Sequence, residues 1–180
     1  MGKNTQQKTS NFLDHRPSVV REFSSGGVVF KKVNGSFLWL VRKTTASKLY
    51  PKQYWMFPKG RIDDTDKDEP GPMAKGLIKA DEKSLQKAAI KEVSEEGGIK
   101  AEIVNKVGTL IYSFTDPNRG KILKFSTFYL MEWKNDLPEG FDKETEEVLW
   151  LDYDGAHKKL SFSGEKDMLK KAQLLLVSTT

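Results

Sequence analysis

Three glutamates within five positions, Glu92, Glu95 and Glu96, are the residues of this sequence best suited to do chemistry. They stand in KEVSEEGG, residues 91–98, which ends on two glycines. Residues three and four apart share a face of an α-helix, so the three carboxylates would point into one sector. Their mutual repulsion weakens a helix by roughly a few tenths of a kcal/mol per pair, and the C-terminal end of the helix dipole disfavours them further. A bound divalent cation would offset both penalties, because hard cations prefer carboxylate oxygen.

Composition restricts the kind of metal site that this cluster could form. The chain has no cysteine and only two histidines, His15 and His157. Thiolate and histidine-rich centres are therefore excluded, and oxygen ligands would have to hold the ion. The alternative is an acidic helix end that is solvated and binds no metal. The spacing of the carboxylates by itself leaves both interpretations open.

The rest of the composition is typical of one globular domain. At 180 residues the chain is long enough for a single hydrophobic core. No apolar run approaches the roughly 20 residues that span a bilayer, and the N-terminal stretch lacks the apolar segment of a secretory signal. The lack of cysteine is typical of cytoplasmic proteins. We therefore expect a cytoplasmic protein without a membrane segment, and the sequence leaves its oligomeric state open.

The net charge of +5 favours an anionic partner. The lysines are scattered, whereas a nucleic-acid-binding domain would gather them into a stripe and bind with a steep salt dependence. A small phosphorylated molecule is therefore the expected partner, and a nucleic acid is the weaker alternative.

The order of apolar and polar residues predicts a flexible N-terminal tail over 1–20 and a single domain over 21–180. Apolar runs on both sides of Asn34-Gly35, a turn dipeptide, predict a hairpin with strands at 22–32 and 37–43. Further strands are predicted at 100–114, 121–133 and 146–153. A closing helix is predicted at 164–177. Because strands and helices do not alternate strictly, the predicted fold class is α+β.

The glutamate cluster lies at the end of a predicted helix. Leu85, Ala89 and Val93 repeat every four residues and form an apolar stripe. Ser84 is expected as the N-cap and Gly98 as part of a left-handed C-cap. The preceding segment, 63–81, is acidic and then rich in proline and glycine, and it is interpreted as an inserted loop.

The run from Lys91 to Ile99 matches the second half of the pattern G-x5-E-x7-R-E-U-x-E-E-x-G-U, in which U is a bulky aliphatic residue. Gly60 of FPKG fits as the opening glycine, and GGVVF, WLVRK and EEVLWL fit as flanking strands. On these residues the sequence resembles the Nudix family over residues 22–172. The resemblance implies a Nudix-type α/β/α sandwich with a mixed β-sheet.

Three features depart from the family pattern. Lys91 stands in place of arginine, which keeps the charge but loses the bidentate fork that could brace a carboxylate. The loop after Gly60 is far longer than the family's. Lys83 occupies the position of the first glutamate, so the adjacent Glu82 is expected to serve instead. These departures motivate one alternative, a Nudix-fold module that binds its ligand without turning it over.

The resemblance implies an enzyme that hydrolyses a phosphoanhydride bond in a nucleoside or dinucleoside polyphosphate. Mg²⁺ or Mn²⁺ on Glu92, Glu95 and Glu96 would neutralise the phosphates and acidify a bound water. The stretch WMFPKGRID is similar to that of diadenosine polyphosphate hydrolases and of diphosphoinositol polyphosphate phosphatases. ADP-ribose, inositol pyrophosphates and capped RNA are the alternative substrates.

Other residues are candidates for supporting roles. The general base could be one of the three glutamates of the motif or an acidic residue near the last predicted strand, Glu144, Glu146 or Glu147. Of the latter, Glu147 lies closest to the strand and is the candidate. Lys59 and Arg42 are candidates to bind phosphate oxygens. The positions with expected structural roles in the motif are Gly60, Glu82, Lys91 and Gly98.

Overall fold

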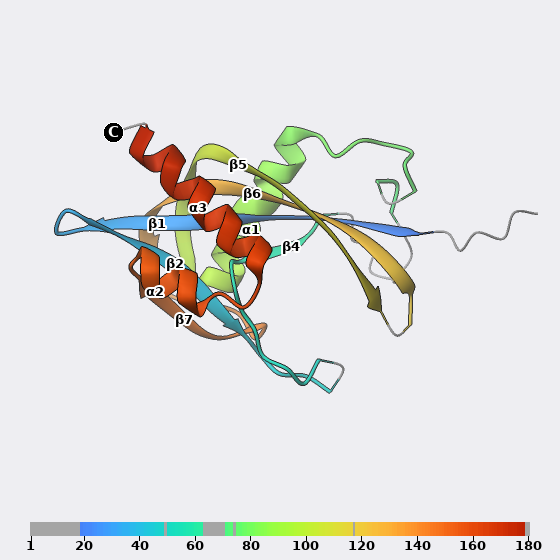
Figure 1. Ribbon diagram of the computed structural model, residues 1–180, viewed down its shortest axis with the longest axis horizontal. Helices are drawn as coiled ribbons and strands as arrows, with labels where there is room; N and C mark the ends of the chain where they lie inside the picture. Colours follow the sequence, from blue (N-terminus) through green and yellow to red (C-terminus); the bar gives the residue numbers. More distant parts are fainter. Residues whose placement is uncertain (1–18, 49, 63–70, 74, 117, 179–180) are drawn as a thin grey trace, which may run out of the picture.

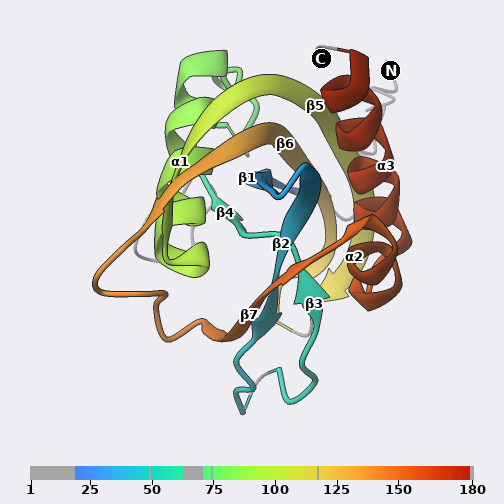
Figure 2. The same cartoon turned by 90° about the vertical axis from the view of Figure 1, so that its left-hand side faces the viewer.

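The computed structural model describes residues 19–48, 50–62, 71–73, 75–116 and 118–178. These residues form a mixed β-sheet between two helical layers (Figure 1). Helix α1 (Glu82–Gly97) covers one face, while α2 (Tyr153–Lys159) and α3 (Ser163–Ser178) cover the other (Figure 2). The predicted α/β/α sandwich is therefore confirmed. Within the described ranges, no helix is both long and apolar enough to cross a membrane.

The sheet has seven strands in the order β3-β2-β1-β6-β5, with β4 also paired to β1 and β7 to β2. Strand β1 runs parallel to β6 and antiparallel to β2 and β4, which makes the sheet mixed. Every strand predicted from the sequence is present, whereas the short strands β3 and β4 and helix α2 were not predicted. The bounds are β1 (Val20–Val33), β2 (Ser36–Thr44), β3 (Trp55–Met56), β4 (Lys59–Arg61), β5 (Ile99–Asp116), β6 (Gly120–Asp136) and β7 (Thr145–Leu151).

The hairpin between β1 and β2 turns at the predicted dipeptide. Asn34 and Gly35 have φ angles of 49° and 83°, the left-handed conformation that a two-residue hairpin turn requires. Val33 therefore pairs with Ser36. This register fixes which side chains of β1 face each helical layer, because a slip of one residue would exchange the two faces.

Helix α1 buries the predicted stripe against one face of the sheet. Leu85, Ala89 and Val93 are 7%, 0% and 0% exposed, and burying a leucine or valine side chain stabilises a fold by about 1.5–3 kcal/mol. Gly27 lets the helix approach β1 closely, since a Cβ there would lie 2.5 Å from a methyl carbon of Val93. The contact fixes where the acidic end of α1 stands over the sheet.

Helix α1 begins at Glu82, two residues before the predicted N-cap, so the assignment of Ser84 to that role was wrong. Asp81 is the N-cap, and its carboxylate accepts hydrogen bonds from the Ser84 amide at 2.9 Å and the Ser84 hydroxyl at 2.6 Å. Gly98 is the predicted left-handed C-cap, with φ 66°. A Cβ at this position would also lie 2.7 Å from backbone atoms of residues 140 and 141.

Two predicted segments fall largely or partly outside the described residues. Of the tail predicted over 1–20, residues 1–18 are not described, and β1 already begins at Val20. Of the predicted insertion over 63–81, residues 63–70 and 74 are not described. The remainder of that insertion forms turns that lead into α1.

Candidate functional site

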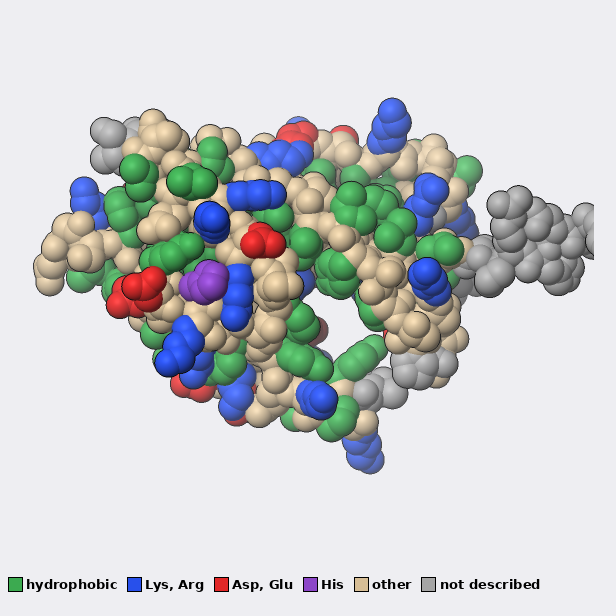
Figure 3. Space-filling view, viewed as in Figure 1, with side chains coloured by type: hydrophobic (Ala, Val, Ile, Leu, Met, Phe, Trp, Pro, Cys, Tyr) green, Lys and Arg blue, Asp and Glu red, His purple; other side chains and the backbone are tan. Residues whose placement is uncertain are grey.

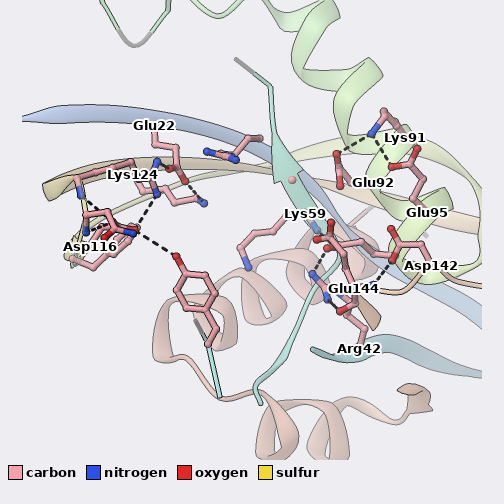
Figure 4. Close-up of a pocket in the computed structure, with 17 residues that line it drawn as sticks. Glu22, Arg42, Lys59, Lys91, Glu92, Glu95, Asp116, Lys124, Asp142 and Glu144 are labelled. Carbon is pink, nitrogen blue, oxygen red and sulfur yellow. Dashed lines mark hydrogen bonds and ion pairs between the residues drawn. The ribbon is translucent and has the colours of Figure 1, made fainter. Parts of the chain in front are cut away.

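The acidic end of α1 opens onto a cavity of about 810 Å³. Figure 4 shows Glu92 and Glu95 on α1 at one end, Glu22 and Lys124 at the other, and Lys59 between them. Thirteen of the seventeen residues that line this cavity are charged, seven acidic and six basic. A cavity lined in this way suits a ligand that carries several charges.

Glu96 is the buried member of the cluster and is 3% exposed. It forms an ion pair with Arg42 of β2 and accepts a hydrogen bond from the Lys59 amide at 2.8 Å. Burial raises the pKa of Glu96 to about 7, against the opposing effect of Arg42 and Lys59. Arg42 is 4% exposed and also donates to the carbonyl of Glu144 at 3.0 Å. Arg42 was predicted as a phosphate ligand. In the structure its guanidinium instead contacts Glu96 and the loop that carries Glu144.

Glu92 and Glu95 are held less tightly than Glu96. Burial raises the pKa of Glu92, and the Lys91 ammonium comes only within 3.5 Å of its carboxylate. Lys91 instead approaches Glu95, at 2.7 Å, and its side chain is 61% exposed. The lysine at the family's arginine position thus contacts the outer carboxylates, and Arg42 braces the inner one.

Gly60 of β4 lies directly against Glu92. A Cβ on Gly60 would fall 2.1 Å from the Glu92 carboxyl carbon, so any side chain at position 60 would take the space of that carboxylate. The predicted structural role of Gly60 therefore has a specific cause, the close approach of β4 to the end of α1.

The carboxylates fit a divalent cation by chemistry but are turned to protein partners. Among the residues that the structure describes, no three acidic or histidine side chains converge on one point. Glu96 turns to Arg42, and Glu95 turns to Lys91. An exposed ion pair such as the latter contributes only about 0–1 kcal/mol, so a cation could displace Lys91. Glu92, Glu95 and Glu96 are the residues that would hold such an ion, which would supply charge neutralisation and a more acidic water.

The opposite wall of the cavity carries basic side chains that pair with carboxylates. Lys124 of β6 pairs with Glu22 at 2.5 Å, and Arg119 contacts the same carboxylate at 3.0 Å. Lys59, predicted as a phosphate ligand, does line the cavity, but its ammonium pairs with Glu165 at 2.6 Å. No sequence pattern pointed to Lys124 or Arg119, because β6 and its hairpin turn reach this site only through the fold.

The loop before β7 is fastened to the end of α1. The amide of Asp142 donates to the Glu95 carbonyl at 2.7 Å, and the Thr145 hydroxyl donates to the Glu96 carbonyl at 2.9 Å. These bonds satisfy carbonyls that a helix leaves open at its C-terminus. They also bring Glu144 onto the wall of the cavity.

Glu147, the predicted general base, is exposed and is not among the residues lining the cavity. Side chains alternate along β7, so Glu147 shares a face with Leu149, which packs toward the core under α2 and α3. Val148 packs on the α1 side instead. The structure therefore favours Glu144 over Glu147 for a role at this site.

Glu82 is also remote from the cluster. It lies in the first turn of α1, where it accepts hydrogen bonds from Tyr129 at 2.8 Å and Lys106 at 2.6 Å. These contacts tie the start of α1 to β5 and β6. The expectation that Glu82 joins the three glutamates is not supported by this placement.

A second, more apolar cavity of about 620 Å³ adjoins the charged one. We call it the slot. Met56, Leu110, Tyr112 and Phe162 supply its apolar wall, and Tyr112 and Phe162 are 36% and 39% exposed. Lys59 and Lys124 line both cavities, so the slot and the charged cavity meet at these two lysines.

Two chain segments that line the charged cavity contact each other. The Tyr50 hydroxyl, after β2, reaches the Asp116 carboxylate at the end of β5, at 3.4 Å. Figure 3 shows the molecule hollowed in this region, between the segment after β2 and the end of the β5–β6 hairpin.

A family model described as the NUDIX domain matches residues 22–172, so the chain belongs to this family. This membership confirms the predicted fold and the predicted family. Nudix hydrolases generally use divalent cations and act on small phosphorylated substrates.

The individual relatives have low sequence identity to this chain. MutT4 of Mycobacterium tuberculosis (strain CDC 1551 / Oshkosh) is 26% identical over an alignment of 167 residues, and the alignment covers 89% of this chain but 58% of that protein. An Ap4A hydrolase of C. elegans, solved as a binary complex, has a TM-score of 0.60 and 21% identity, covering 89% of this chain and 99% of its own. The NUDIX domain of Shewanella oneidensis NrtR, complexed with ADP ribose, has a TM-score of 0.53 and 13% identity, covering 91% and 93%. At these identities the solved structures show the fold alone.

The raised pKa of Glu96 predicts a specific pH dependence of stability. Glu96 titrates near 4.5 when unfolded and near 7 when folded, so folding takes up a proton between these values. Without divalent cations, the free energy of unfolding should fall as pH rises from about 5 to 8, by at most ~1.4 kcal/mol per pH unit. Urea unfolding at each pH measures this, with Glu96→Gln as the control that should lose this component. An identical pH profile for the two proteins would contradict the prediction.

Proposed function

We propose that this protein hydrolyses a phosphoanhydride bond of a nucleoside or dinucleoside polyphosphate, with Mg²⁺ or Mn²⁺ held by Glu92, Glu95 and Glu96. The observation that carries the proposal is that one charged cavity is lined both by these carboxylates and by the ammonium groups of Lys59 and Lys124. A cation on the acidic side would bind phosphate oxygens and acidify a water. Ammonium groups on the other side would hold the rest of the phosphate chain.

The slot favours a substrate that contains a nucleobase over a substrate made only of phosphates and a polyol. It joins the charged cavity at Lys59 and Lys124, so a phosphate chain there could continue into an apolar group beside Tyr112 and Phe162. Aromatic side chains offer a flat apolar face on which a planar ring can stack. A nucleoside polyphosphate matches both cavities, whereas an inositol pyrophosphate would leave the slot unused.

Glu144 is the candidate general base in this proposal. It lies on the cavity wall, and its charge contributes to raising the pKa of Glu92, which places the two carboxylates in electrostatic contact. A cytoplasmic location remains part of the proposal, since it rests on the lack of cysteine.

The test is product release from a panel of dinucleoside polyphosphates, nucleoside triphosphates, ADP-ribose, capped RNA and inositol pyrophosphates. Each is assayed with Mg²⁺, with Mn²⁺ and with chelator. We expect metal-dependent turnover, with kcat/KM higher for dinucleoside or nucleoside polyphosphates than for inositol pyrophosphates.

Other outcomes of the panel would change the assignment. A preference for inositol pyrophosphates would remove the role given to the slot. Tight metal-dependent binding of one compound without turnover would identify a binding module instead of an enzyme. Turnover that is unaffected by chelator would contradict the metal role of the three glutamates.

A further inference from the structure

Glu165, in the first turn of α3, is a buried carboxylate for which the sequence suggested no role. The residue is 2% exposed. Its Oε2 accepts a hydrogen bond from the Phe57 amide at 2.8 Å, and its Oε1 accepts one from the Lys59 ammonium at 2.6 Å. A buried carboxylate destabilises a fold unless it is paired and hydrogen-bonded. Both oxygens of Glu165 are therefore hydrogen-bonded, and both partners belong to one short segment of the chain. Lys59, in that segment, precedes Glu165 by 106 residues.

That segment, residues 57–59, is held from the opposite direction by β1. The Gly27 amide donates to the Pro58 carbonyl at 3.1 Å. A Cβ on Gly26 would lie 2.2 Å from the same carbonyl oxygen, so the segment rests directly on the strand. Residues 57–59 are therefore clamped between the backbone of β1 and the carboxylate of Glu165.

Lys59 connects this clamp to the acidic cluster. Its backbone amide donates to Glu96 at 2.8 Å, while its ammonium pairs with Glu165. One residue thus links the carboxylate at the start of α3 to the buried carboxylate at the end of α1. The side chain of Lys59 also lies where the charged cavity and the slot meet.

We propose that Glu165 is a positioning residue for the hydrolysis reaction. It fixes Lys59 so that the Lys59 amide orients Glu96, and so that the Lys59 ammonium stands at the junction of the two cavities. Glu165 lines the slot, but both of its oxygens are occupied within the protein, so it acts through Lys59. The inference rests on the proposed function for its effect on turnover, but the positioning itself can be measured separately.

A double-mutant cycle tests whether Glu165 acts through Lys59. Glu165→Gln keeps the size of the side chain and removes its charge, and Lys59→Met removes the partner. We expect each variant to lower kcat/KM about tenfold or more, since small misplacements at a reacting site are costly. The double variant should lose no more than Lys59→Met alone, because dependent residues are not additive. Asp154→Asn, which removes an exposed charge in the first turn of α2, is the matched control and should leave kcat/KM unchanged.

A second measurement does not require turnover. Hydrogen exchange of the Lys59 amide, followed by NMR, reports whether its bond to Glu96 persists. Glu165→Gln should speed this exchange about tenfold, as local opening becomes easier, and Asp154→Asn should not. If the wild-type protein hydrolyses nothing in the panel, the proposed function fails, and the exchange result still decides the role of Glu165.

Three results would overturn the inference. The first is a full additive loss of kcat/KM in the double variant. The second is a folded Glu165→Gln protein with unchanged kcat/KM, and the third is unchanged exchange of the Lys59 amide. If Glu165→Gln does not fold, the double variant Glu165→Gln/Lys59→Met is compared with Lys59→Met instead. The double variant lacks both charges of the ion pair, so no buried charge is left unpaired. Equal kcat/KM in those two proteins supports the inference, and a larger loss in the double variant overturns it.

Discussion

Replacing Glu92 with glutamine is expected to lower kcat/KM for metal-dependent hydrolysis by about 10²–10³-fold. Glu92 is the half-buried carboxylate that packs against Gly60, and its pKa is raised by burial. A cation would relieve this electrostatic strain, and an amide cannot replace the charge that attracts the cation. Steady-state kinetics with Mg²⁺ and Mn²⁺, together with Mn²⁺ binding followed by EPR, measure the effect. The Mn²⁺ affinity should fall along with kcat/KM.

Comparison variants separate this effect from a general loss of charge. Glu139→Gln removes an exposed carboxylate outside the cavity and should retain wild-type kinetics. Glu144→Gln should lower kcat by about 10²-fold if Glu144 is the general base, and Glu147→Gln should have a much smaller effect. Unaltered Mn²⁺ affinity in Glu92→Gln, or a larger loss for Glu147→Gln than for Glu144→Gln, would contradict these assignments.

Replacing Arg42 with methionine is expected to lower the free energy of unfolding by about 3–5 kcal/mol. The side chains of Arg42 and Glu96 are 5% and 4% exposed, so the substitution would leave a buried carboxylate without its ion-pair partner. It would also remove a hydrogen bond to the carbonyl of Glu144, and so loosen the loop that carries the candidate base. Urea denaturation at pH 8 measures the loss, since Glu96 is then ionised.

A second substitution shows whether the unpaired charge of Glu96 causes the loss of stability in Arg42→Met. In the double variant Arg42→Met/Glu96→Gln no charge remains unpaired, so we expect part of the lost stability to return. Arg42→Lys should be intermediate, because lysine keeps the charge but lacks the planar fork that reaches two acceptors. Loss of stability in the double variant equal to the sum of the two single losses would show that the two residues act independently.

Together these contacts explain how the fold accommodates an acidic helix end. The C-terminal dipole and mutual repulsion disfavour the three glutamates. Arg42 and the Lys59 amide offset the charge of Glu96, and Lys91 offsets that of Glu95. Asp142 and Thr145 satisfy the last helical carbonyls. Glu92 has the weakest protein partner of the three, which makes it the carboxylate with the most to gain from a bound cation.

The sequence by itself determined the features that depend on neighbouring residues. The Asn34-Gly35 hairpin, the stripe of α1 and the Gly98 cap follow from turn chemistry and helical periodicity, and all three are confirmed. The spacing of Glu92, Glu95 and Glu96 likewise carried the family resemblance, which the match over residues 22–172 confirms. Local rules were less reliable at the helix start, where Asp81 and Ser84 are both good caps and only the hydrogen bonds distinguish them.

Only the tertiary structure decided which distant residues meet the glutamates. Nothing near Arg42 in sequence indicates that it braces Glu96, 54 residues later, and nothing near Glu165 indicates Lys59 as its partner. The choice of Glu144 over Glu147 depends on how the loop before β7 is fastened to α1 and on which way β7 alternates. Pairing across a sheet and packing between layers fix such contacts, and residues far apart in the chain carry no local pattern that records them.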